Sequence, residues 1–301
     1  MILDRLFANI AVSVDPFALC LLNTGWRLGL PGPPDVMFHF VLYGSGVLRG
    51  PRGEPQMISP YSLAVIPRGI EHTIECGTDI RSEHSIDHTP PAGSGVPTFT
   101  AGNTDPADLK VACGVVHVAY GDALGLFQNL REIVVADLSG YPQVRSAFES
   151  MIAEQANPSI GSEALSSTYM SQCLVYLLRH LSALEDAPIP WLSALEDPAL
   201  ARAVDAMLAD VAAHHTVESL SEVALMSRSV FSDRFRAAFG CTPMTFLRDL
   251  RLRRSIQLIQ TMHELSIAQI ARRVGFSSRS HFTNVFTARF GASPSAYRSA
   301  N

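Results

Sequence analysis

The spacing of apolar residues changes character near residue 140. Before that point, short apolar runs alternate with turns rich in glycine and proline, which is typical of β-strands joined by tight turns. The clearest runs are 36–43, 62–67, 72–75 and 110–120. Such runs predict a sandwich or a small barrel. Residues 89–108, rich in Pro, Gly, Thr and Asp, predict a surface loop.

From residue 141 onward the apolar spacing becomes helical. It predicts an amphipathic helix over 144–154 and a longer helix over 164–181, which is apolar on more than half of its circumference. One side of the longer helix is expected to cover the β domain. The other side is expected to face a second subunit or to be buried within the same chain. Pro198 opens a further helix with one apolar face.

The strongest pattern is an internal repeat that ends near residue 298. From Ser227 onward, residues recur at an offset of 51 positions. The matched pairs are Ser227/Ser278, Phe231/Phe282, Phe235/Phe286, Phe239/Phe290, Gly240/Gly291, Pro243/Pro294 and Phe246/Tyr297. An internal repeat indicates that one supersecondary unit has been used twice.

Each copy of the repeat has the signals of a capped helix. Ser227 and Ser278 are expected to accept hydrogen bonds from the free backbone N–H groups of the helix that follows. The Phe residues recur every fourth position and therefore stack on one face. Glycine and then proline end each helix. A shorter helix and a tight turn come before it, which predicts two helix–turn–helix units.

The face opposite the Phe residues is polar in both copies. In the first copy it carries Ser229, Ser232, Asp233 and Arg236. In the second copy it carries Arg279, Ser280, Thr283, Asn284 and Thr287. Such short or forked side chains suit the edges of DNA bases and the phosphates. Two solvated amphipathic hairpins are the alternative, but the duplication and the charge distribution favour DNA binding.

The charge is distributed unevenly along the chain. The net charge of the whole chain is −5, yet residues 1–200 hold 10 Lys and Arg against 21 Asp and Glu, and residues 201–301 hold 13 against 7. The first segment therefore carries −11 and the second +6. A basic C-terminal segment on an otherwise acidic chain predicts a nucleic-acid-binding domain attached to another domain.

Length and composition narrow the class of protein. A chain of 301 residues favours two domains. Apolar runs are too short to span a membrane, and the N-terminus lacks the pattern of a signal peptide. The five cysteines are widely spaced, which suits reduced thiols in a cytoplasmic protein better than a disulfide framework or a zinc site.

The segments 217–240, 267–286 and 289–298 together resemble the AraC/XylS family of transcription regulators. The resemblance implies two helix–turn–helix units joined by a long helix, here from Pro243 to about Met262. Two such helices in one chain can enter successive major grooves. The buried positions of the joining helix are expected to be Phe246, Leu250, Ile256 and Ile259.

Two residues depart from the family pattern. Leu225 occupies the position of a turn glycine, which the second copy has at Gly275. A leucine at positive φ would be strained, so we expect the first turn to be built differently. Asp233 occupies a position that often holds a basic or amide residue. An acid repels phosphate but can accept from a cytosine amino group, so the second copy is the better candidate for base recognition.

The N-terminal part resembles the cupin domain that precedes the DNA-binding domain in many AraC-type regulators. Pro67, Gly69 and His72 fit the second cupin motif, whose histidine is a metal ligand in cupin enzymes. Of the first motif only His39 is present, and Met37 stands where its glutamate would fall. Because a catalytic metal needs three protein ligands, we predict no metal and no cofactor. His39 and His72 could instead face the barrel interior and bind a small molecule. The alternative, at least as well supported, is that each is a buried histidine that only satisfies a neighbour's hydrogen bond.

The predicted fold is therefore α+β. It has a cupin-like β-barrel with trailing helices over 1–184, a linker over 185–197, and an all-α DNA-binding domain over 198–301. The barrel interior is the candidate small-molecule pocket, with the residues His39, Met37, Val41, His72 and Cys113. An alternative is that the barrel only mediates dimerisation.

The expected function is that of a sequence-specific DNA-binding regulator, with activation favoured by the resemblance. The alternative function is a cupin-type metal-dependent enzyme fused to a DNA-binding module. Expected partners are a promoter or operator duplex, RNA polymerase, a small-molecule effector and a second copy of the chain, without a membrane. The base contacts are predicted to be Ser229, Ser232, Asp233, Arg279, Ser280, Thr283 and Asn284. The phosphate contacts are predicted to be Arg236, Arg253, Arg254 and Thr287.

Overall fold

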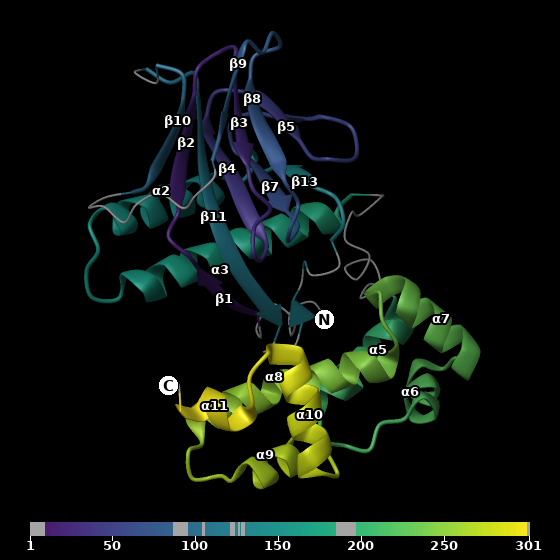
Figure 1. Cartoon of the computed structure of the whole chain (residues 1–301). Coiled ribbons are helices and arrows are strands. Elements are labelled where there is room, and N and C mark those ends of the chain that lie inside the picture. Colours follow the sequence, from purple (N-terminus) through teal and green to yellow (C-terminus); the bar gives the residue numbers. More distant parts are fainter. Residues whose placement is uncertain are drawn as a thin grey trace. The chain divides into compact units, whose positions relative to one another are not determined.

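A computed structural model describes residues 10–86, 96–103, 106–120, 124–125, 127, 130–184 and 197–299 (Figure 1). These residues form two compact units. One unit contains residues 12–86, 96–103, 106–118, 127 and 130–184. The other contains residues 197–299 together with 10–11, 119–120 and 124–125. Residues 185–196 of the predicted linker lie outside the described residues.

The first of these units, the N-terminal unit, contains most of the described strands and two helices. The strands are β1 (Ile10–Val14), β2 (Ala18–Leu22), β3 (Trp26–Leu30), β4 (Met37–Tyr43), β5 (Gly46–Arg49), β6 (Gln56–Ile58), β7 (Ser62–Ile66), β8 (His72–Cys76), β9 (Ser82–Ser85), β10 (Thr98–Ala101), β11 (Leu109–Tyr120), β12 (Leu124–Gly125) and β13 (Val134–Asp137). Strand β12 and the ends of β1 and β11 fall in the second unit. The helices are α2 (Pro142–Ala156) and α3 (Ser162–Ser182). Both predicted helices, over 144–154 and 164–181, are confirmed.

The strands form two sheets that share one core. The larger sheet has the order β10-β2-β11-β4-β7-β13, and the smaller sheet has the order β6-β5-β8-β3-β9. Leu28, Leu48 and Ile74 of the smaller sheet belong to the same core cluster as Val41, Ala64 and Val111 of the larger sheet. The cupin-like fold is confirmed, but in the described residues the strands make two facing sheets and do not close into the expected barrel.

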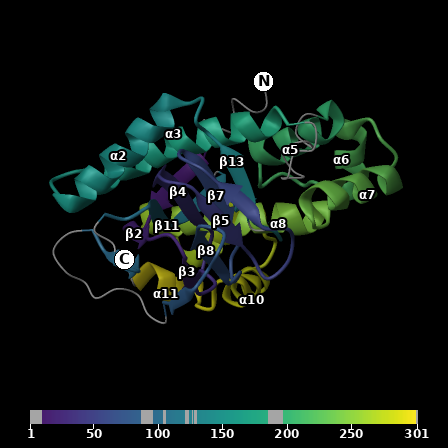
Figure 2. The same cartoon turned by 90° about the horizontal axis from the view of Figure 1, so that it is seen from above.

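The central strands of the larger sheet, β4 and β7, are buried on both of their faces. Residues of β4 alternate between the core that the two sheets share, where Val41 lies, and the opposite face, which is covered by α2 and α3 (Figures 1 and 2). On that opposite face the rings of Phe40 and Phe148 stack with centroids 4.1 Å apart. All five residues of β7 are buried. Burial on both faces explains why these strands are continuous apolar runs.

One expectation about this unit was wrong. The segment 89–108, predicted to be a surface loop, contains β10, which pairs in parallel with β2 from Thr98↔Leu19 to Ala101↔Leu22. Only one of its four residues, Ala101, is buried. A half-exposed edge strand has no continuous apolar run, so composition alone assigned it to a loop.

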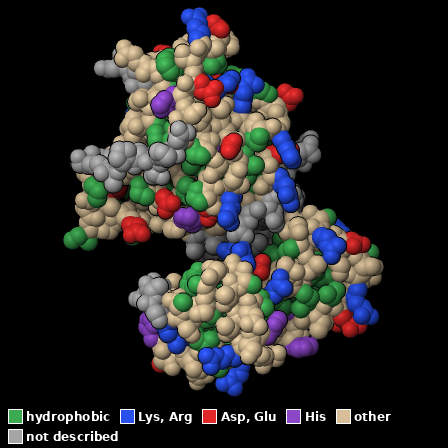
Figure 3. Space-filling view, viewed as in Figure 1, with side chains coloured by type: hydrophobic (Ala, Val, Ile, Leu, Met, Phe, Trp, Pro, Cys, Tyr) green, Lys and Arg blue, Asp and Glu red, His purple; other side chains and the backbone are tan. Residues whose placement is uncertain are grey.

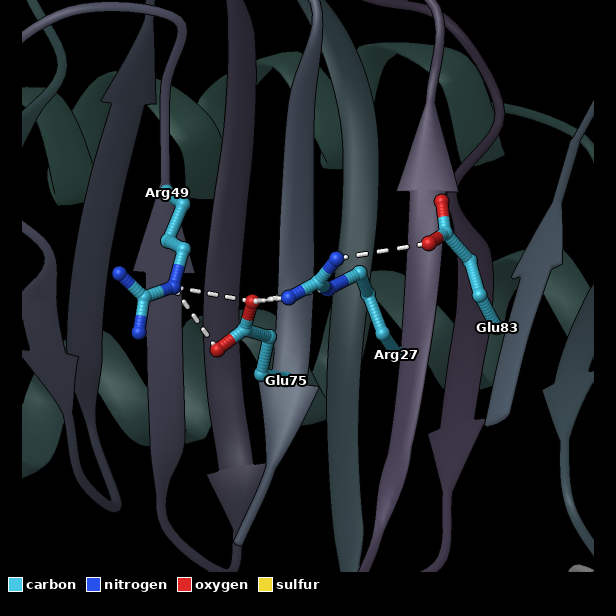
Figure 4. A network of polar contacts seen from close by, with 4 residues as sticks. All are labelled: Arg27, Arg49, Glu75 and Glu83. Carbon is cyan, nitrogen blue, oxygen red and sulfur yellow. Dashed lines mark hydrogen bonds and ion pairs between the residues drawn. The ribbon is translucent and has the colours of Figure 1, made fainter. Parts of the chain in front are cut away.

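The outer side of the smaller sheet carries an ion-pair network (Figure 4). Glu75 is buried, with 3% of its side chain exposed, and it accepts from Arg27 Nε at 2.8 Å and from Arg49 Nε at 2.9 Å. Arg27 also reaches the more exposed Glu83 at 3.4 Å. The carboxylate of Glu75 on β8 therefore contacts both neighbouring strands, β3 and β5. Arg27 is the register partner of Glu75 on β3, and Arg49 lies two positions after Val47, which is the register partner of Glu75 on β5.

In the C-terminal unit, the described residues 197–299 contain helices and no strand. Its helices are α5 (Pro198–Ala209), α6 (Val217–Ala224), α7 (Arg228–Phe239), α8 (Pro243–Thr261), α9 (Ile267–Arg273), α10 (Arg279–Phe290) and α11 (Pro294–Ser299). The predicted joining helix from Pro243 is α8. Phe246, Leu250 and Ile259 are buried in it as expected, and Ile256 is half-buried. No helix of the described residues is long and apolar enough to cross a membrane.

We expect Glu75→Ala to lower the free energy of unfolding of the N-terminal unit by about 1–3 kcal/mol. Removing one partner of a buried ion pair leaves the other charges without compensation, although Arg27 and Arg49 are exposed enough to recover some hydration. Glu83→Ala is the matched control and should cost less than about 1 kcal/mol, because Glu83 is half-exposed and makes one long contact. Equal losses in urea unfolding would contradict this account.

Candidate functional site

The first helix–turn–helix unit consists of α6 and α7. Thr216 and Ser219 form a capping box at the start of α6, and the Ser227 side chain accepts from the backbone N–H of Val230 at the start of α7. Phe231, Phe235 and Phe239 are buried on one side of α7. Gly240 ends α7 in the left-handed conformation with φ 70°. The predicted cap, Phe face and glycine stop are all present.

The second unit, α9 and α10, repeats this construction. Ser266 and Gln269 form its capping box, and Ser278 accepts from the backbone N–H of His281. Phe282 and Phe286 are fully buried, whereas Phe290 is half-buried. Gly291 ends α10 with φ 76°. Both α7 and α10 are thus held by aromatic residues on one side.

The predicted base contacts are all at least partly accessible to solvent. Ser229, Asp233, Arg279, Ser280 and Asn284 are exposed, and Ser232 and Thr283 are half-buried. Sequence reasoning missed Arg228, which the offset of 51 matches to Arg279. Arg228 is exposed and lies 3.4 Å from Glu218 of α6. The offset of 51 positions between the two copies is the sequence signal that could have identified Arg228.

Of the predicted phosphate contacts, Arg236 and Arg254 are exposed, and Arg253 and Thr287 are half-buried. Arg254 also contacts Gln257 one turn away on α8. The visible face of the C-terminal unit carries several Arg side chains and few acidic ones (Figure 3). This agrees with the net charge of +6 over residues 201–301.

The two tight turns adopt the same conformation, which corrects the expectation for Leu225. Leu225 has φ 56° and ψ 41°, the left-handed region, and its backbone N–H donates to Glu222. Gly275 has φ 87°, and its N–H donates to Arg272 in the same way. Leucine is tolerated because its side chain is 81% exposed. The turns differ elsewhere, because the second has one more residue, Ser277, before its helix cap.

Gly275 is required for a second reason, which is the close approach of Arg251. A Cβ atom at residue 275 would lie 2.8 Å from the Arg251 guanidinium and 2.9 Å from Ala212 Cα. From α8, Arg251 donates to the carbonyl of Val211 at 2.7 Å and to that of Ala213 at 2.8 Å. Burial lowers the pKa of Arg251. Arg251 therefore ties the segment between α5 and α6 to α8 beside the turn of the second unit.

Helix α5 braces the first unit through two further arginine contacts. Arg202 donates to the carbonyls of Val223 at 3.0 Å and Ala224 at 3.1 Å, which are free carbonyls at the end of α6. Asp197 caps α5 and also pairs with Arg234 of α7. A helix before the first unit was predicted, but its bracing contacts were not, because single arginines carry no periodic signal.

The five predicted pocket residues all lie in or against the core between the two sheets. Val41 and Cys113 belong to the core cluster, Met37 packs against it, and His39 and His72 are buried. The two histidines join β4 of one sheet to β8 of the other, with their Nε2 atoms 2.7 Å apart. His72 Nδ1 lies 3.0 Å from the Ile70 carbonyl, so His72 Nδ1 is assigned as a donor and His39 Nε2 as the donor to His72.

This histidine pair does not fit the metal site that the cupin fold implies. Two imidazoles on one zinc ion, each about 2.1 Å from it in tetrahedral geometry, need nitrogen atoms more than about 3 Å apart. The separation of 2.7 Å is that of a hydrogen bond. The described residues contain no group of three or more His, Cys, Asp or Glu side chains placed to hold a metal ion.

Two capped helix–turn–helix units beside a two-sheet cupin-like unit define a class of DNA-binding regulators. Residues 2–183 match the cupin family model, and residues 220–300 match a helix-turn-helix domain model. The HTH-type transcriptional regulator AlkR of Acinetobacter baylyi is 38% identical over 98% of this chain and 98% of its own. The RCS-specific HTH-type transcriptional activator RclR of Escherichia coli is 25% identical over 93% of this chain and 90% of its own.

A crystal structure of an AraC-type regulator from Chromobacterium violaceum is 30% identical and covers 35% of this chain and 94% of that one, with a TM-score of 0.34. The chain belongs to the AraC family of helix–turn–helix transcription regulators, with a cupin-type N-terminal domain.

We expect Gly275→Ala to destabilise the C-terminal unit by about 2–4 kcal/mol. The added methyl combines left-handed strain with a clash against Arg251 and the Ala212 backbone. Gly291→Ala is the matched control: its φ is similar, 76°, but nothing lies within 4 Å of its Cβ position. Only the strain of about 1–2 kcal/mol should remain there. The difference between the two melting shifts measures the clash, and no difference would refute it.

The histidine pair predicts loss of stability in acid. Burial, followed by the charge of His72, holds the pKa of His39 well below its ordinary value, and burial also lowers the pKa of His72. Below pH ~6.5 the unfolded chain therefore binds more protons than the folded chain. The contribution of the two histidines to the free energy of unfolding is fully present above that pH and is lost as the pH falls. We expect a loss of about 2 kcal/mol between pH 7 and 5.5.

Urea unfolding of the N-terminal unit at several pH values measures this loss. The double variant His39→Leu/His72→Met removes both titrating groups and should flatten the profile over this range. His117 should affect stability in the opposite direction, with a contribution that is lost as the pH rises. Its two aspartate partners, Asp35 and Asp15, raise its pKa despite its partial burial. A wild-type profile as flat as that of the double variant would contradict the prediction.

Proposed function

We propose that the chain recognises a specific DNA sequence through α7 and α10, each placed in a major groove. The observation that carries this proposal is the repeated construction of the two helices. Each is capped by serine, fixed by buried phenylalanines, and exposes a polar face on the basic unit of the chain. A helix of this kind, preceded by a short helix and a tight turn, is a DNA-recognition helix.

Helix α10 has the side chains with the clearest base chemistry. Arg279 can donate twice to guanine, and Asn284 can pair with adenine. Ser280 and Thr283 complete its set. In α7 the corresponding set is Ser229, Ser232 and Asp233, and we add Arg228 because it is the counterpart of Arg279. Asp233 favours a cytosine amino group.

Phosphate contacts are assigned to Arg236, Arg253, Arg254 and Thr287. Each neutralised phosphate releases counterions, so affinity should fall steeply as the salt concentration rises. Arg236 and Arg254 are exposed, which supports their assignment to phosphate contacts. These contacts position the protein on the duplex and contribute equally to any sequence.

The N-terminal domain is proposed to receive a signal and to mediate dimerisation. His39 Nδ1 is buried without a hydrogen-bond partner in the described protein, which supports a polar small molecule bound beside Met37, Val41, His72 and Cys113. Exposed Leu165 on α3 supports contact with a second copy. We assign the chain to the cytoplasm and to regulation without catalysis, with RNA polymerase as a further partner. Activation is favoured because the relative RclR is an activator.

Arg279→Ala should weaken binding to a duplex that the wild-type chain selects from a random library by about 1–3 kcal/mol, with little change on unselected DNA. The lost bidentate contact to a base explains the selectivity of the effect. Filter binding or anisotropy at fixed salt measures both affinities.

Arg236→Ala is the comparison variant, because a phosphate contact should weaken both duplexes alike and lower the salt dependence by about one counterion. Loss of equal size on both duplexes for Arg279→Ala would reject its base-reading role. Failure of the wild-type chain to enrich any sequence would reject the proposed function itself.

A further inference from the structure

Two of the five cysteines face each other in the core of the N-terminal unit. All five lie in the described part of the chain and are free thiols. Cys20 and Cys113 are 93 positions apart, yet their Sγ atoms are 2.8 Å apart. A disulfide bond is about 2.05 Å long, so the two sulfur atoms need to approach by only about 0.8 Å to bond.

The strands that carry this pair hold the thiols together. Cys20 lies on β2 and Cys113 on the neighbouring antiparallel strand β11, where Cys20 is the register partner of Val111. Cys113 is two positions further along, so it points to the same face of the sheet as Val111. Both cysteines belong to the core cluster between the two sheets, and the exposed fractions are 0% and 4%. The short distance between the two Sγ atoms shows that the side chains of these diagonal neighbours lean toward each other.

The remaining cysteines are not placed in this way. Cys76 lies 4.0 Å from the Thr24 hydroxyl, and Cys173 lies 3.9 Å from the Val144 carbonyl. Cys241 is half-buried on the C-terminal unit, beside charged residues. Among the described residues, Cys20 and Cys113 are the only two cysteines whose sulfur atoms are in contact. The other three cysteines therefore serve as internal controls.

We propose that Cys20 and Cys113 are an oxidation site at which a two-electron thiol oxidant forms a reversible intramolecular disulfide. With a peroxide, the thiolate of one cysteine attacks a peroxide oxygen and the O–O bond breaks. The leaving hydroxide takes up the thiol proton as water, and a sulfenic acid remains. The second thiol attacks this sulfur, the S–O bond breaks, and a second water leaves. Two thiols lose two electrons, and the peroxide is reduced to two waters.

Burial sets the rate of this reaction. Burial, and secondly the contact with Cys20, raises the pKa of the Cys113 thiol well above its ordinary value. The attacking species is the thiolate, so little of it exists at neutral pH. Because the thiolate fraction grows about tenfold for each pH unit below the pKa, the rate should rise about tenfold between pH 7 and pH 8. The site therefore reacts slowly, and only with oxidants that are small enough to enter the core.

The experiment treats the folded full-length protein with hydrogen peroxide and maps its cysteines. The expected result is a fall from five titratable thiols to three, a Cys20–Cys113 cross-linked peptide in a non-reducing digest, and recovery of all thiols with dithiothreitol. Cys76→Ser should leave the cross-link unchanged. Cys20→Ala and Cys113→Ala should each abolish it, with melting curves to confirm that both variants fold.

Three outcomes would overturn the proposal. The five thiols could persist under peroxide, the disulfide could join a different pair, or single cysteines could advance to sulfinic acid without a cross-link. The peptide map of the wild-type protein decides between these outcomes, even where an alanine variant fails to fold. The inference concerns the N-terminal unit alone, so it does not depend on the proposed DNA contacts.

Discussion

The recognition helices depend on aromatic rings packed at a spacing of four residues. Phe231, Phe235 and Phe239 contact one another in sequence, with ring centroids 5.6 and 4.4 Å apart, and the last two also contact Phe246 at the start of α8. The second unit repeats this arrangement with Tyr297 of α11 in the place of Phe246. A helix held this firmly on one side can leave its other side polar and exposed at little cost to stability.

The two turns show how context decides whether glycine is required. At residue 225 the backbone is left-handed and the side chain points into solvent. A leucine there incurs the strain of this conformation but collides with nothing. At residue 275 the same conformation lies against Arg251, and a side chain would collide with it. Glycine in the second copy is thus explained by the arginine of a different helix. The family pattern of a turn glycine reflects packing as well as backbone conformation.

The C-terminal unit could be predicted from the sequence almost completely, whereas the N-terminal unit could be predicted only in outline. Helix caps, Phe spacing and Gly–Pro stops are local, and duplication displays each of them twice. Strand pairing is not local: β2 pairs with β10 and β11, which are about 80–90 positions away, and nothing near residue 20 encodes that. Arg251 and Arg202 were missed for the same reason, because their acceptors are backbone carbonyls distant in sequence.

The core between the two sheets is where polar chemistry and packing meet. On β4, His39 faces the core and is the register partner of Cys113 on β11, while the next residue, Phe40, stacks on Phe148 of α2. Because β4 is buried on both faces, His39 packs toward the second sheet while the next residue of the same strand carries the contact with α2. A substitution of different volume at His39 or Cys113 therefore has no open solvent to expand into, and it costs packing energy in the core between the two sheets.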